Sequence, residues 1–393
     1  MENLAHNTMP IRSSTNTLLS DYETKLFGES HTATFSNTRN TSFLSLIIKT
    51  TSTCNLSCKY CDADTYSNKR IQLITLENII KNATLYYNTI DFIWHGGEPT
   101  LMGIDFYKKV VSIENRYNKE GQTIKNSIQT NGTLLNEEWV NFLIKNKFGI
   151  GISLDGQKIM HDSNRIFKNG TGSFDNVLKN INLLKMLKAK FGVLAVITED
   201  TLKTSPKQFL NFFIENGLTN FGLNWQRPAL NIKRDDHLQR SNYDDFMIGL
   251  FDAWYDIGDP NIHIREFDSI ISKVTGGKKG FCILEGNCIG KYAGIAPNGD
   301  VFHCDEFMFD QEYKLGNIMK NSFHEILGDS NRRLQLLKEK NSNEINKLKC
   351  NWLKVCHGGC PKDRYVAIKS DNEPTCCGWG SVIDHIYNKI HLQ

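Results

Sequence analysis

The sequence predicts an α/β fold in which a partial (β/α)6 barrel precedes a small cysteine-rich domain with a β-hairpin and short helices. From residue 43 onward, short β-rich runs alternate with helical patterns. Such alternation is typical of parallel strands covered by helices. The cysteines fall into two separate groups, and the larger group occupies the last third of the chain. This second observation sets the C-terminal part apart from the barrel.

Six runs are expected to be strands, each followed by a helical pattern. Six units cannot close the usual eight-stranded barrel, so we expect an open, partial barrel. Parallel βα folds place their functional sites at the C-terminal ends of the strands. The expected strands are residues 43–51, 90–96, 125–132, 148–156, 191–198 and 219–225.

One helix is clearly marked in the sequence. Ser173 stands where an N-cap is expected, and Val177, Ile181, Leu184 and Leu187 form one apolar stripe at helical spacing. The stripe predicts packing against the core, with no chemistry of its own.

Composition shifts divide the chain into four parts. The first is polar and weakly periodic, and the third is helical and ends in a Gly/Lys-rich stretch. The fourth contains a hairpin signal, because Asn298-Gly299 favours a tight turn between two short strands. We expect an N-terminal extension (1–42), the partial barrel (43–235), a helical linker (236–280) and the cysteine-rich domain (281–393).

The overall composition excludes several classes. The chain has 393 residues and a formal net charge of +3, so its charge balance gives no sign of nucleic-acid binding. No apolar run is long enough to cross a membrane. The N-terminus lacks the charged start and apolar core of a signal peptide. We therefore expect a cytoplasmic protein, with its thiols kept reduced.

Eleven cysteines are many for such a protein, and clustered thiols in a reducing compartment indicate metal binding before disulfides. Three of them follow the first expected strand in the spacing C-x3-C-x2-C. A zinc ribbon requires two C-x2-C pairs, whereas three thiolates on one loop suit a 4Fe–4S cube whose fourth iron stays open. These three are Cys54, Cys58 and Cys61, and the other eight are Cys282, Cys288, Cys304, Cys350, Cys356, Cys360, Cys376 and Cys377.

This triplet, with Tyr60 before its last cysteine, resembles the radical S-adenosylmethionine (radical SAM) enzymes. Further segments at the expected strand ends match that family: "GGEP", "QTNG" and "SLDG", followed by Arg165. Glycines in the first segment let the backbone approach a ligand closely. The resemblance implies cofactor binding by Tyr60, Gly96, Gly97, Glu98, Pro99, Ser153 and Arg165.

The resemblance also implies the cofactors and the chemistry. S-adenosylmethionine would bind the open iron of the 4Fe–4S cluster and yield a 5′-deoxyadenosyl radical, which abstracts hydrogen from an unactivated C–H bond. An electron donor such as flavodoxin or ferredoxin is implied as a partner.

The C-terminal cysteines, with "NGDVFHCDEF", "KLGNI" and "CNWLKVCHGGC", resemble the SPASM extension, which carries up to two auxiliary 4Fe–4S clusters. By this resemblance, the first auxiliary cluster would be held by Cys282, Cys288, Cys304 and Cys360. The second would be held by Cys350, Cys356 and either Cys376 or Cys377.

The second auxiliary site departs from the family pattern, because Lys347 stands where the full motif has another cysteine. Cys377 or His357 could supply a fourth ligand, since histidine replaces cysteine in some iron–sulfur sites. An open iron and a zinc site are the remaining alternatives.

Three further residues attract interpretation. Asp305 follows Cys304 directly, and in sulfatase-maturing relatives an aspartate at this place serves as a general base. A backbone-bonded hairpin aspartate is the competing interpretation. His95 precedes "GGEP" and faces either the substrate or the packed interior, and His161 is expected to be structural.

Radical enzymes with SPASM extensions usually act on peptides or proteins, and two functions compete. We expect a maturase that crosslinks a ribosomally made precursor peptide, forming a cyclophane between an aromatic ring and a Cβ atom. "WHGGEP" and the missing cysteine favour this function, although no separate leader-binding domain fits in residues 1–42. The alternative is an anaerobic sulfatase-maturating enzyme, which oxidises Cys or Ser of a sulfatase to formylglycine and which "CDEF", "FDAWYD" and "HGGCPK" resemble. A protein that uses its clusters only for electron transfer or iron sensing is disfavoured, because it needs no methionine pocket.

Overall fold

The computed structural model describes residues 43–61, 69–227, 240–278, 280–286, 288–308, 310–369 and 377–391. The expected N-terminal extension and Cys376 lie outside these residues.

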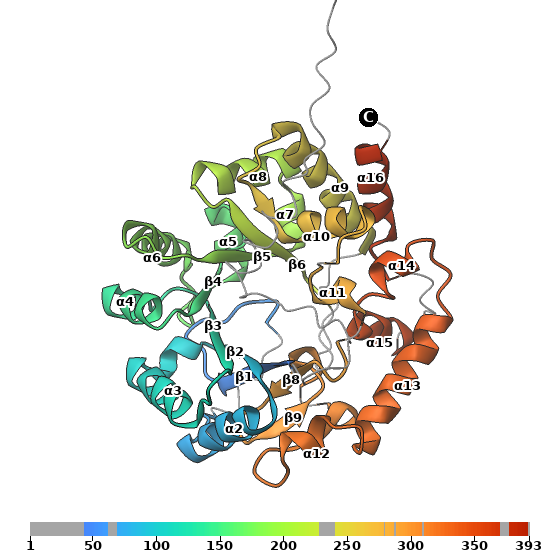
Figure 1. Ribbon diagram of the computed structural model, residues 1–393. Helices are drawn as coiled ribbons and strands as arrows, with labels where there is room; N and C mark the ends of the chain where they lie inside the picture. Colours follow the sequence, from blue (N-terminus) through green and yellow to red (C-terminus); the bar gives the residue numbers. More distant parts are fainter. Residues whose placement is uncertain are drawn as a thin grey trace, which may run out of the picture.

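A single curved sheet of ten strands organises the described chain, in the order β10-β9-β8-β1-β2-β3-β4-β5-β6-β7. All neighbouring pairs from β1 to β7 are parallel. The sheet curves into a partial barrel with helices on its outer face (Figure 1). The first six strands match the sequence predictions: β1 (Phe43–Thr51), β2 (Thr89–Gly96), β3 (Thr123–Thr130), β4 (Gly149–Ser153), β5 (Gly192–Ile197) and β6 (Asn220–Trp225).

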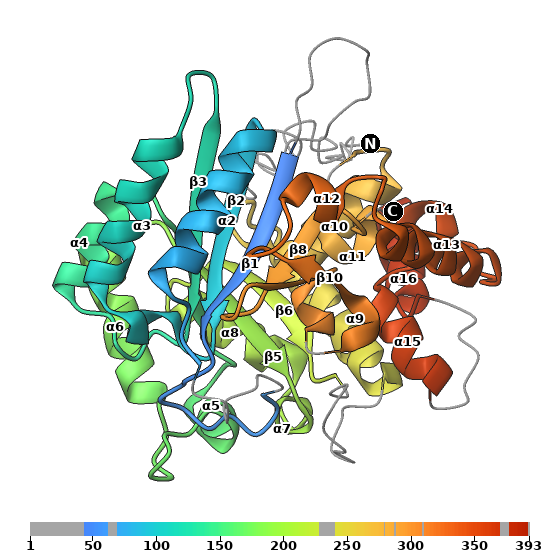
Figure 2. The same cartoon turned by 90° about the horizontal axis from the view of Figure 1, so that it is seen from below.

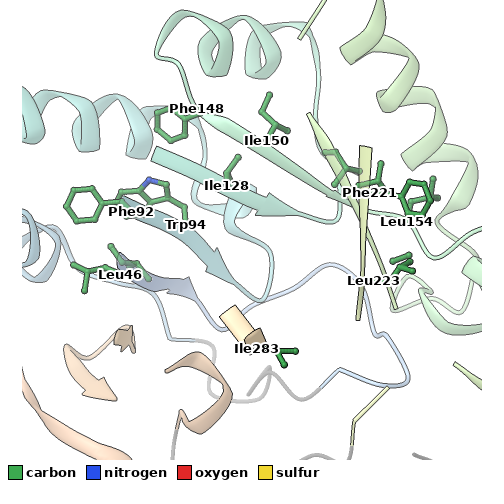
Figure 3. Close-up of a cluster of buried hydrophobic side chains, with 14 of the residues drawn as sticks. Leu46, Phe92, Trp94, Ile128, Phe148, Ile150, Leu154, Phe221, Leu223 and Ile283 are labelled. Atoms are coloured by element: carbon green, nitrogen blue, oxygen red, sulfur yellow. The ribbon is translucent and has the colours of Figure 1, made fainter. Parts of the chain in front are cut away.

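The main core lies between this sheet and its helices. Side chains of alternate strand residues, such as Leu46, Phe92, Trp94 and Ile128, point to this side and are buried (Figure 3). The intervening residues therefore face the inside of the barrel. The covering helices are α2 (Leu73–Tyr86), α3 (Ile104–Tyr117), α4 (Glu137–Lys145), α6 (Phe174–Met186) and α8 (Pro206–Glu215), with the 3-10 turn η1 (Pro99–Met102) after β2. The short helices α5 (Lys158–Asn164) and α7 (Glu199–Leu202) lie at the C-terminal ends of the strands (Figure 2).

The α6 helix carries the expected stripe, since Val177, Ile181 and Leu184 are fully buried. Ser173 occupies the N-cap position as predicted, but its side chain makes no capping hydrogen bond. Its hydroxyl donates to the Arg165 carbonyl at 2.7 Å. Asp162 accepts the Phe174 N–H instead, at 2.8 Å, because the chain before the helix returns from α5 and brings this carboxylate to the helix start.

The C-terminal hairpin extends the barrel sheet, which the sequence did not indicate. The first hairpin strand, β8 (Tyr292–Ile295), pairs in parallel with β1, and β9 (Asp300–Phe302) and β10 (Lys314–Asn317) follow in antiparallel order. Gly299 has φ +84° in the turn, as an Asn-Gly turn requires. The cysteine-rich part therefore lies directly beside the first barrel strand.

The remaining helices cover the open side of the barrel (Figures 1 and 2). The last helix packs back on the expected linker, where Ser381 donates to Asp244 at 2.9 Å and His385 pairs with Asp252 at 2.9 Å. Within that linker, β7 (His263–Ile264) adds a short strand to the sheet edge. The helices are α9 (Arg240–Ile257), α10 (Arg265–Val274), α11 (Cys282–Glu285), α12 (Phe323–Leu327), α13 (Arg332–Asn346), α14 (Leu353–Cys356), α15 (Pro361–Lys369) and α16 (Gly380–His391), with 3-10 turns η2 (Asp305–Phe307) and η3 (Gln311–Tyr313). Among the described helices, none combines the length and apolar character needed to cross a membrane.

Candidate active site

The loop with the first three cysteines leaves the C-terminal end of β1 and is held by backbone hydrogen bonds. Gly97 N–H donates to the Thr51 carbonyl at 2.7 Å, and Glu98 N–H donates to the Thr53 carbonyl at 2.9 Å. On another side, Ser57 N–H donates to the Ile166 carbonyl at 2.7 Å. The loop is thus fixed against both the end of β2 and the segment after α5.

The three thiols lie close enough to interact electrostatically with one another. Burial raises the pKa of Cys54 to about 11 and that of Cys58 to about 12, although the Arg165 guanidinium opposes the second shift. Free thiols in this environment hold their protons, and metal binding displaces them. A set of three sulfur donors on one loop fits an iron–sulfur cluster that keeps one iron open.

The glycines of "GGEP" allow β2 to lie against the cysteine loop. A Cβ atom on Gly97 would lie 2.4 Å from the Thr53 carbonyl oxygen. On Gly96, which has φ +145°, it would lie 2.4 Å from the Thr51 carbonyl oxygen. A side chain at Gly97 would push the start of the cysteine loop away from β2, and one at Gly96 would push away the end of β1.

Glu98 is fully buried, and its carboxylate ties β2 to β3. One oxygen accepts Thr100 N–H at 2.9 Å and the Thr130 hydroxyl at 2.6 Å, and the other accepts Asn131 N–H at 2.8 Å. Burial raises the pKa of Glu98, and these donors oppose that shift. Pro99 begins η1 directly afterwards. Glu98 and Pro99 therefore fix the end of β2 beside the predicted cofactor site.

Asn131 and Thr133 in the loop after β3 also hold the cysteine loop, although the sequence analysis did not single them out. Asn131 Nδ2 donates to Asn55 at 2.9 Å and lies 3.9 Å from Cys54 Sγ. Asn55 in turn donates to the Thr133 hydroxyl at 2.8 Å. Asn131 belongs to the "QTNG" motif, and Thr133 directly follows it.

Asp155, in "SLDG", connects several of the predicted cofactor residues. Its Oδ2 atom accepts Arg165 Nε at 2.9 Å and the Tyr60 hydroxyl, and the Arg165 guanidinium lies 5.3 Å from the centre of the Tyr60 ring. Asp155 Oδ1 accepts Val196 N–H at 3.0 Å. Among the described residues, the terminal guanidinium nitrogens of Arg165 make no hydrogen bond. They can therefore bind an anion beside the cysteine loop.

Ser153 ends β4 and accepts Gln129 Nε2 at 3.1 Å. His161 is buried, with Nδ1 3.3 Å from Asp155 N and Nε2 2.9 Å from the Ser173 hydroxyl. Burial lowers the pKa of His161 to about 4. A neutral ring between these partners agrees with the expected structural role.

The four cysteines expected at the first auxiliary cluster lie in separate parts of the C-terminal region and are connected by pairwise electrostatic interactions. Among the described residues, no three His, Cys, Asp or Glu side chains form a ready-made metal-ion site. Electrostatic interactions link Cys282 to Cys288 and Cys360, and link Cys288 to Cys304. Burial raises the pKa of Cys288 to about 12 and that of Cys304 and Cys360 well above the usual range. The donor set fits the proposed 4Fe–4S cluster.

The second auxiliary site is described in part. Cys356 and Cys377 are buried, and Cys350 is half-buried. Cys377 packs against Gly359, next to Cys360, since a Cβ on that glycine would lie 2.8 Å from the Cys377 Cβ.

His357, the other candidate ligand, has φ +51° and packs against Gly286, because a Cβ there would lie 2.2 Å from the His357 Cβ. Cys376 lies outside the described residues.

Asp305 lies where the hairpin meets the barrel. Its carboxylate is 3.6 Å from the Lys49 ammonium and accepts Cys304 Sγ–H at 3.2 Å. Lys49 Nζ is also 3.0 Å from His95 Nδ1. The structure therefore places the candidate base between a predicted iron ligand and two barrel residues.

A neighbouring ionic network joins the same two regions. Glu306 accepts Lys362 Nζ at 2.6 Å and lies 3.3 Å from Arg227, which is 3.4 Å from Asp363. Burial opposes ionisation of Glu306, but Lys362 and Arg227 hold its pKa at about 2. Arg227 lies two residues after the end of β6 and also interacts electrostatically with Cys360, so it links the barrel to the predicted auxiliary site.

Comparison with known proteins agrees with this geometry. Residues 48–212 match the family model of the radical SAM superfamily, and residues 282–361 match the SPASM iron–sulfur cluster-binding domain. The cysteine-type anaerobic sulfatase-maturating enzyme of Clostridium novyi is 33% identical over 338 residues, covering 82% of this chain and 88% of the relative. The serine-type enzyme of Bacteroides thetaiotaomicron is 31% identical over 366 residues, covering 85% and 86%.

Solved structures give the same result. The structure of anSMEcpe with bound AdoMet and Cp18Cys peptide has a TM-score of 0.78 and 29% identity, covering 89% of this chain and 98% of that one. SuiB of Streptococcus suis bound to precursor peptide SuiA has a TM-score of 0.56 and 19% identity, covering 85% and 74%, and this likeness concerns the fold alone.

The fold, the sulfur donors and these matches lead to one assignment of family and cofactors. The chain belongs to the radical SAM enzymes that carry a SPASM domain, the family of the anaerobic sulfatase-maturating enzymes, and is an oxidoreductase that uses S-adenosylmethionine and 4Fe–4S clusters.

Proposed function

We propose that this protein is an anaerobic sulfatase-maturating enzyme, which oxidises a Cys or Ser side chain of a sulfatase to formylglycine. The observation that carries the proposal is the similarity to cysteine-type and serine-type maturating enzymes over more than four-fifths of the chain. It reverses the preference for peptide crosslinking that the sequence motifs suggested.

The position of Asp305 supports this chemistry. Conversion of a Cys side chain to a thioaldehyde removes one hydrogen atom from Cβ, one proton from the thiol and one electron. Water then replaces sulfur, which gives the aldehyde and hydrogen sulfide. S-adenosylmethionine and the first cluster, when bound, supply the radical that takes the hydrogen atom. Asp305 would take the proton, since its carboxylate lies beside Cys304. An auxiliary cluster held by Cys304 and its partner cysteines would accept the electron.

The residues of the predicted cofactor site have different roles. Gly96 and Gly97 allow close backbone packing, and Ser153 at the end of β4 accepts a hydrogen bond from Gln129. Arg165 is oriented by Asp155 and would offer its terminal N–H groups to the carboxylate of S-adenosylmethionine. The buried surroundings of Glu98 keep this frame rigid.

Peptide crosslinking is the second candidate. It is favoured by His95 before "GGEP", and by Lys347 in place of the cysteine that would complete the second auxiliary site. Both functions need the same radical and differ in the fate of the substrate carbon.

The experiment uses the full chain reconstituted anaerobically with iron and sulfide, with S-adenosylmethionine and a reductant. Sulfatase-type peptides with Cys or Ser, and aromatic-rich precursor peptides behind a leader, are compared by mass spectrometry with an aldehyde trap. A trapped aldehyde on a sulfatase peptide supports the proposal. A loss of two hydrogens without aldehyde, and fragmentation blocked across a short ring, would replace it by crosslinking. Absence of both aldehyde and ring from every peptide would contradict both candidate functions.

A further inference from the structure

We propose that Lys49 is a positioning residue for the oxidation step, which holds Asp305 and His95 together across the junction of barrel and hairpin. The inference rests on the proposed function, in which Asp305 is the base. It concerns a residue that carries no sequence motif of its own.

The geometry brings together three side chains from three elements. Lys49 lies in β1, His95 in β2 and Asp305 at the start of η2. Lys49 and His95 are register partners in adjacent parallel strands, so both side chains leave the same face of the sheet. The Lys49 ammonium lies 3.0 Å from His95 Nδ1 and 3.6 Å from Asp305 Oδ2. With side-chain exposures of 17% for Lys49 and 25% for Asp305, this pair is screened less than a surface ion pair.

The contacts of His95 fix its ring. Nδ1 faces two donors, the Lys49 ammonium at 3.0 Å and the Gly96 N–H at 2.8 Å. An ammonium group has no acceptor, so Nδ1 must be the unprotonated nitrogen. The neutral ring therefore carries its proton on Nε2. Lys49 thus sets the orientation of His95 as well as that of Asp305.

Cluster binding makes Lys49 more important for Asp305. Cys304 Sγ lies 3.2 Å from Asp305 Oδ1. As an iron ligand, Cys304 is a thiolate and has no proton to donate. The two anionic groups then repel each other, and the carboxylate depends on its cationic partner.

The neighbouring cations, Lys362 and Arg227, form ion pairs with carboxylates other than Asp305. Lys362 donates to Glu306 at 2.6 Å, and Arg227 lies 3.3 Å from Glu306 and 3.4 Å from Asp363. Among the described residues, Lys49 is the cation in contact with Asp305. Its loss leaves the base without a charged partner.

The test compares the wild type with Lys49→Met, Lys49→Arg, Asp305→Asn and the double variant Lys49→Met/Asp305→Asn. Aldehyde and 5′-deoxyadenosine are measured on the peptide that the wild type converts. We expect Lys49→Met to lower aldehyde formation by about 10- to 100-fold, as misplacement of a catalytic group does, while 5′-deoxyadenosine still forms. Lys49→Arg keeps the charge and should restore part of the coupling, which is the amount of aldehyde formed per 5′-deoxyadenosine. In the Asp305→Asn background, Lys49→Met has little further effect, because its target is gone.

A second readout does not depend on turnover. The midpoint potential of the auxiliary cluster is measured by redox titration with electron paramagnetic resonance. Removing a positive charge near the cluster shifts the potential in the negative direction, so Lys49→Met should show this shift and Lys49→Arg should not. Lys314→Met is the matched control, because it removes a 2.7 Å ion pair with Asp300 on the same hairpin. It should change neither the coupling nor the potential.

Wild-type coupling in Lys49→Met, or effects of Lys49→Met and Asp305→Asn that multiply independently, would overturn the inference. An unchanged potential would do the same. If Lys49→Met fails to assemble its clusters, Lys49→Gln replaces it, with Lys49→Arg as its charged counterpart. Failure of the proposed function has a different signature, since the wild type then forms no aldehyde, while the potentials still test the contact.

Discussion

Arg165 Nε donates to Asp155 Oδ2 at 2.9 Å, and both side chains are buried beside the loop that carries Cys54, Cys58 and Cys61. The same carboxylate oxygen accepts the Tyr60 hydroxyl. One carboxylate thus orients both an aromatic residue of the cysteine motif and the cation expected at the cofactor. Asp155 is central to the site, although the motif that contains it predicts a cofactor contact only for Ser153.

Asp155→Asn should destabilise the protein and impair cofactor cleavage. It leaves a buried guanidinium without its counter-charge, which costs roughly 3–5 kcal/mol in comparable buried pairs. The free energy of unfolding is measured by denaturant titration, and 5′-deoxyadenosine formation is measured under reductant. Asp175→Asn, which removes an exposed ion pair to Lys158, is the control and should change stability by at most about 0.5 kcal/mol. Equal effects of the two variants would refute the assigned role.

Gly97→Ala should prevent correct assembly of the first cluster. The added Cβ would lie 2.4 Å from the Thr53 carbonyl oxygen, so the cysteine loop must move. Iron content and the visible absorption of the reconstituted protein give the measurement. At Gly170, with φ +85°, no described atom lies within 4 Å of an added Cβ, so Gly170→Ala carries only backbone strain of about 1–2 kcal/mol. That control should keep its iron.

Asp91 should make stability depend on pH. It lies in β2 with one carboxylate oxygen lacking a hydrogen bond among the described residues, and burial raises its pKa to about 7 despite the opposing charge of Lys125. The folded state holds this proton more tightly than the unfolded state. The stabilisation is therefore complete below about pH 4 and is lost as the pH rises toward 7.

Asp91→Asn cannot ionise, so its stability should change less between pH 4 and pH 8 than that of the wild type. At pH 8 it should be more stable by on the order of 2 kcal/mol. Apparent melting temperatures of both proteins across this range test the prediction. Parallel curves for the two proteins would show that Asp91 is ionised when folded.

Removal of single iron ligands should separate the two stages of the reaction. Cys58→Ala should lose 5′-deoxyadenosine formation and aldehyde together, because the first cluster is incomplete. Cys304→Ala should retain 5′-deoxyadenosine formation and lose the aldehyde, because the auxiliary site no longer takes up the electron. Iron analysis and chromatography of the nucleoside check both variants. Full aldehyde yield from Cys304→Ala would exclude the auxiliary cluster from the oxidation.

The sequence predicted the barrel well, because its information is local. Each of the six strands is a short apolar run, and periodicity alone reveals such a run. Ser173 takes the predicted N-cap position but makes no capping hydrogen bond, for the opposite reason. A capping preference is a weak local signal, and the tertiary contacts with Arg165 and His161 outweigh it.

In the candidate site too, some residues are evident from the sequence and others only from the structure. The cysteine triplet and the "GGEP" glycines stand out in the sequence, because their chemistry needs particular residue types at short spacing. Asp155 and Asn131 lay inside quoted motifs without being singled out, since their partners lie on other loops.

By itself, the sequence determined the order of the βα units, the grouping of the sulfur ligands and the membership of a radical enzyme family. Only the tertiary structure decided that β8 pairs with β1 and so brings the cysteine-rich hairpin beside the barrel. It also decided that Lys49, His95 and Asp305 meet at that junction. The physical reason is that strand periodicity acts over a few residues, whereas these contacts depend on how the whole sheet curves and which edges it leaves open.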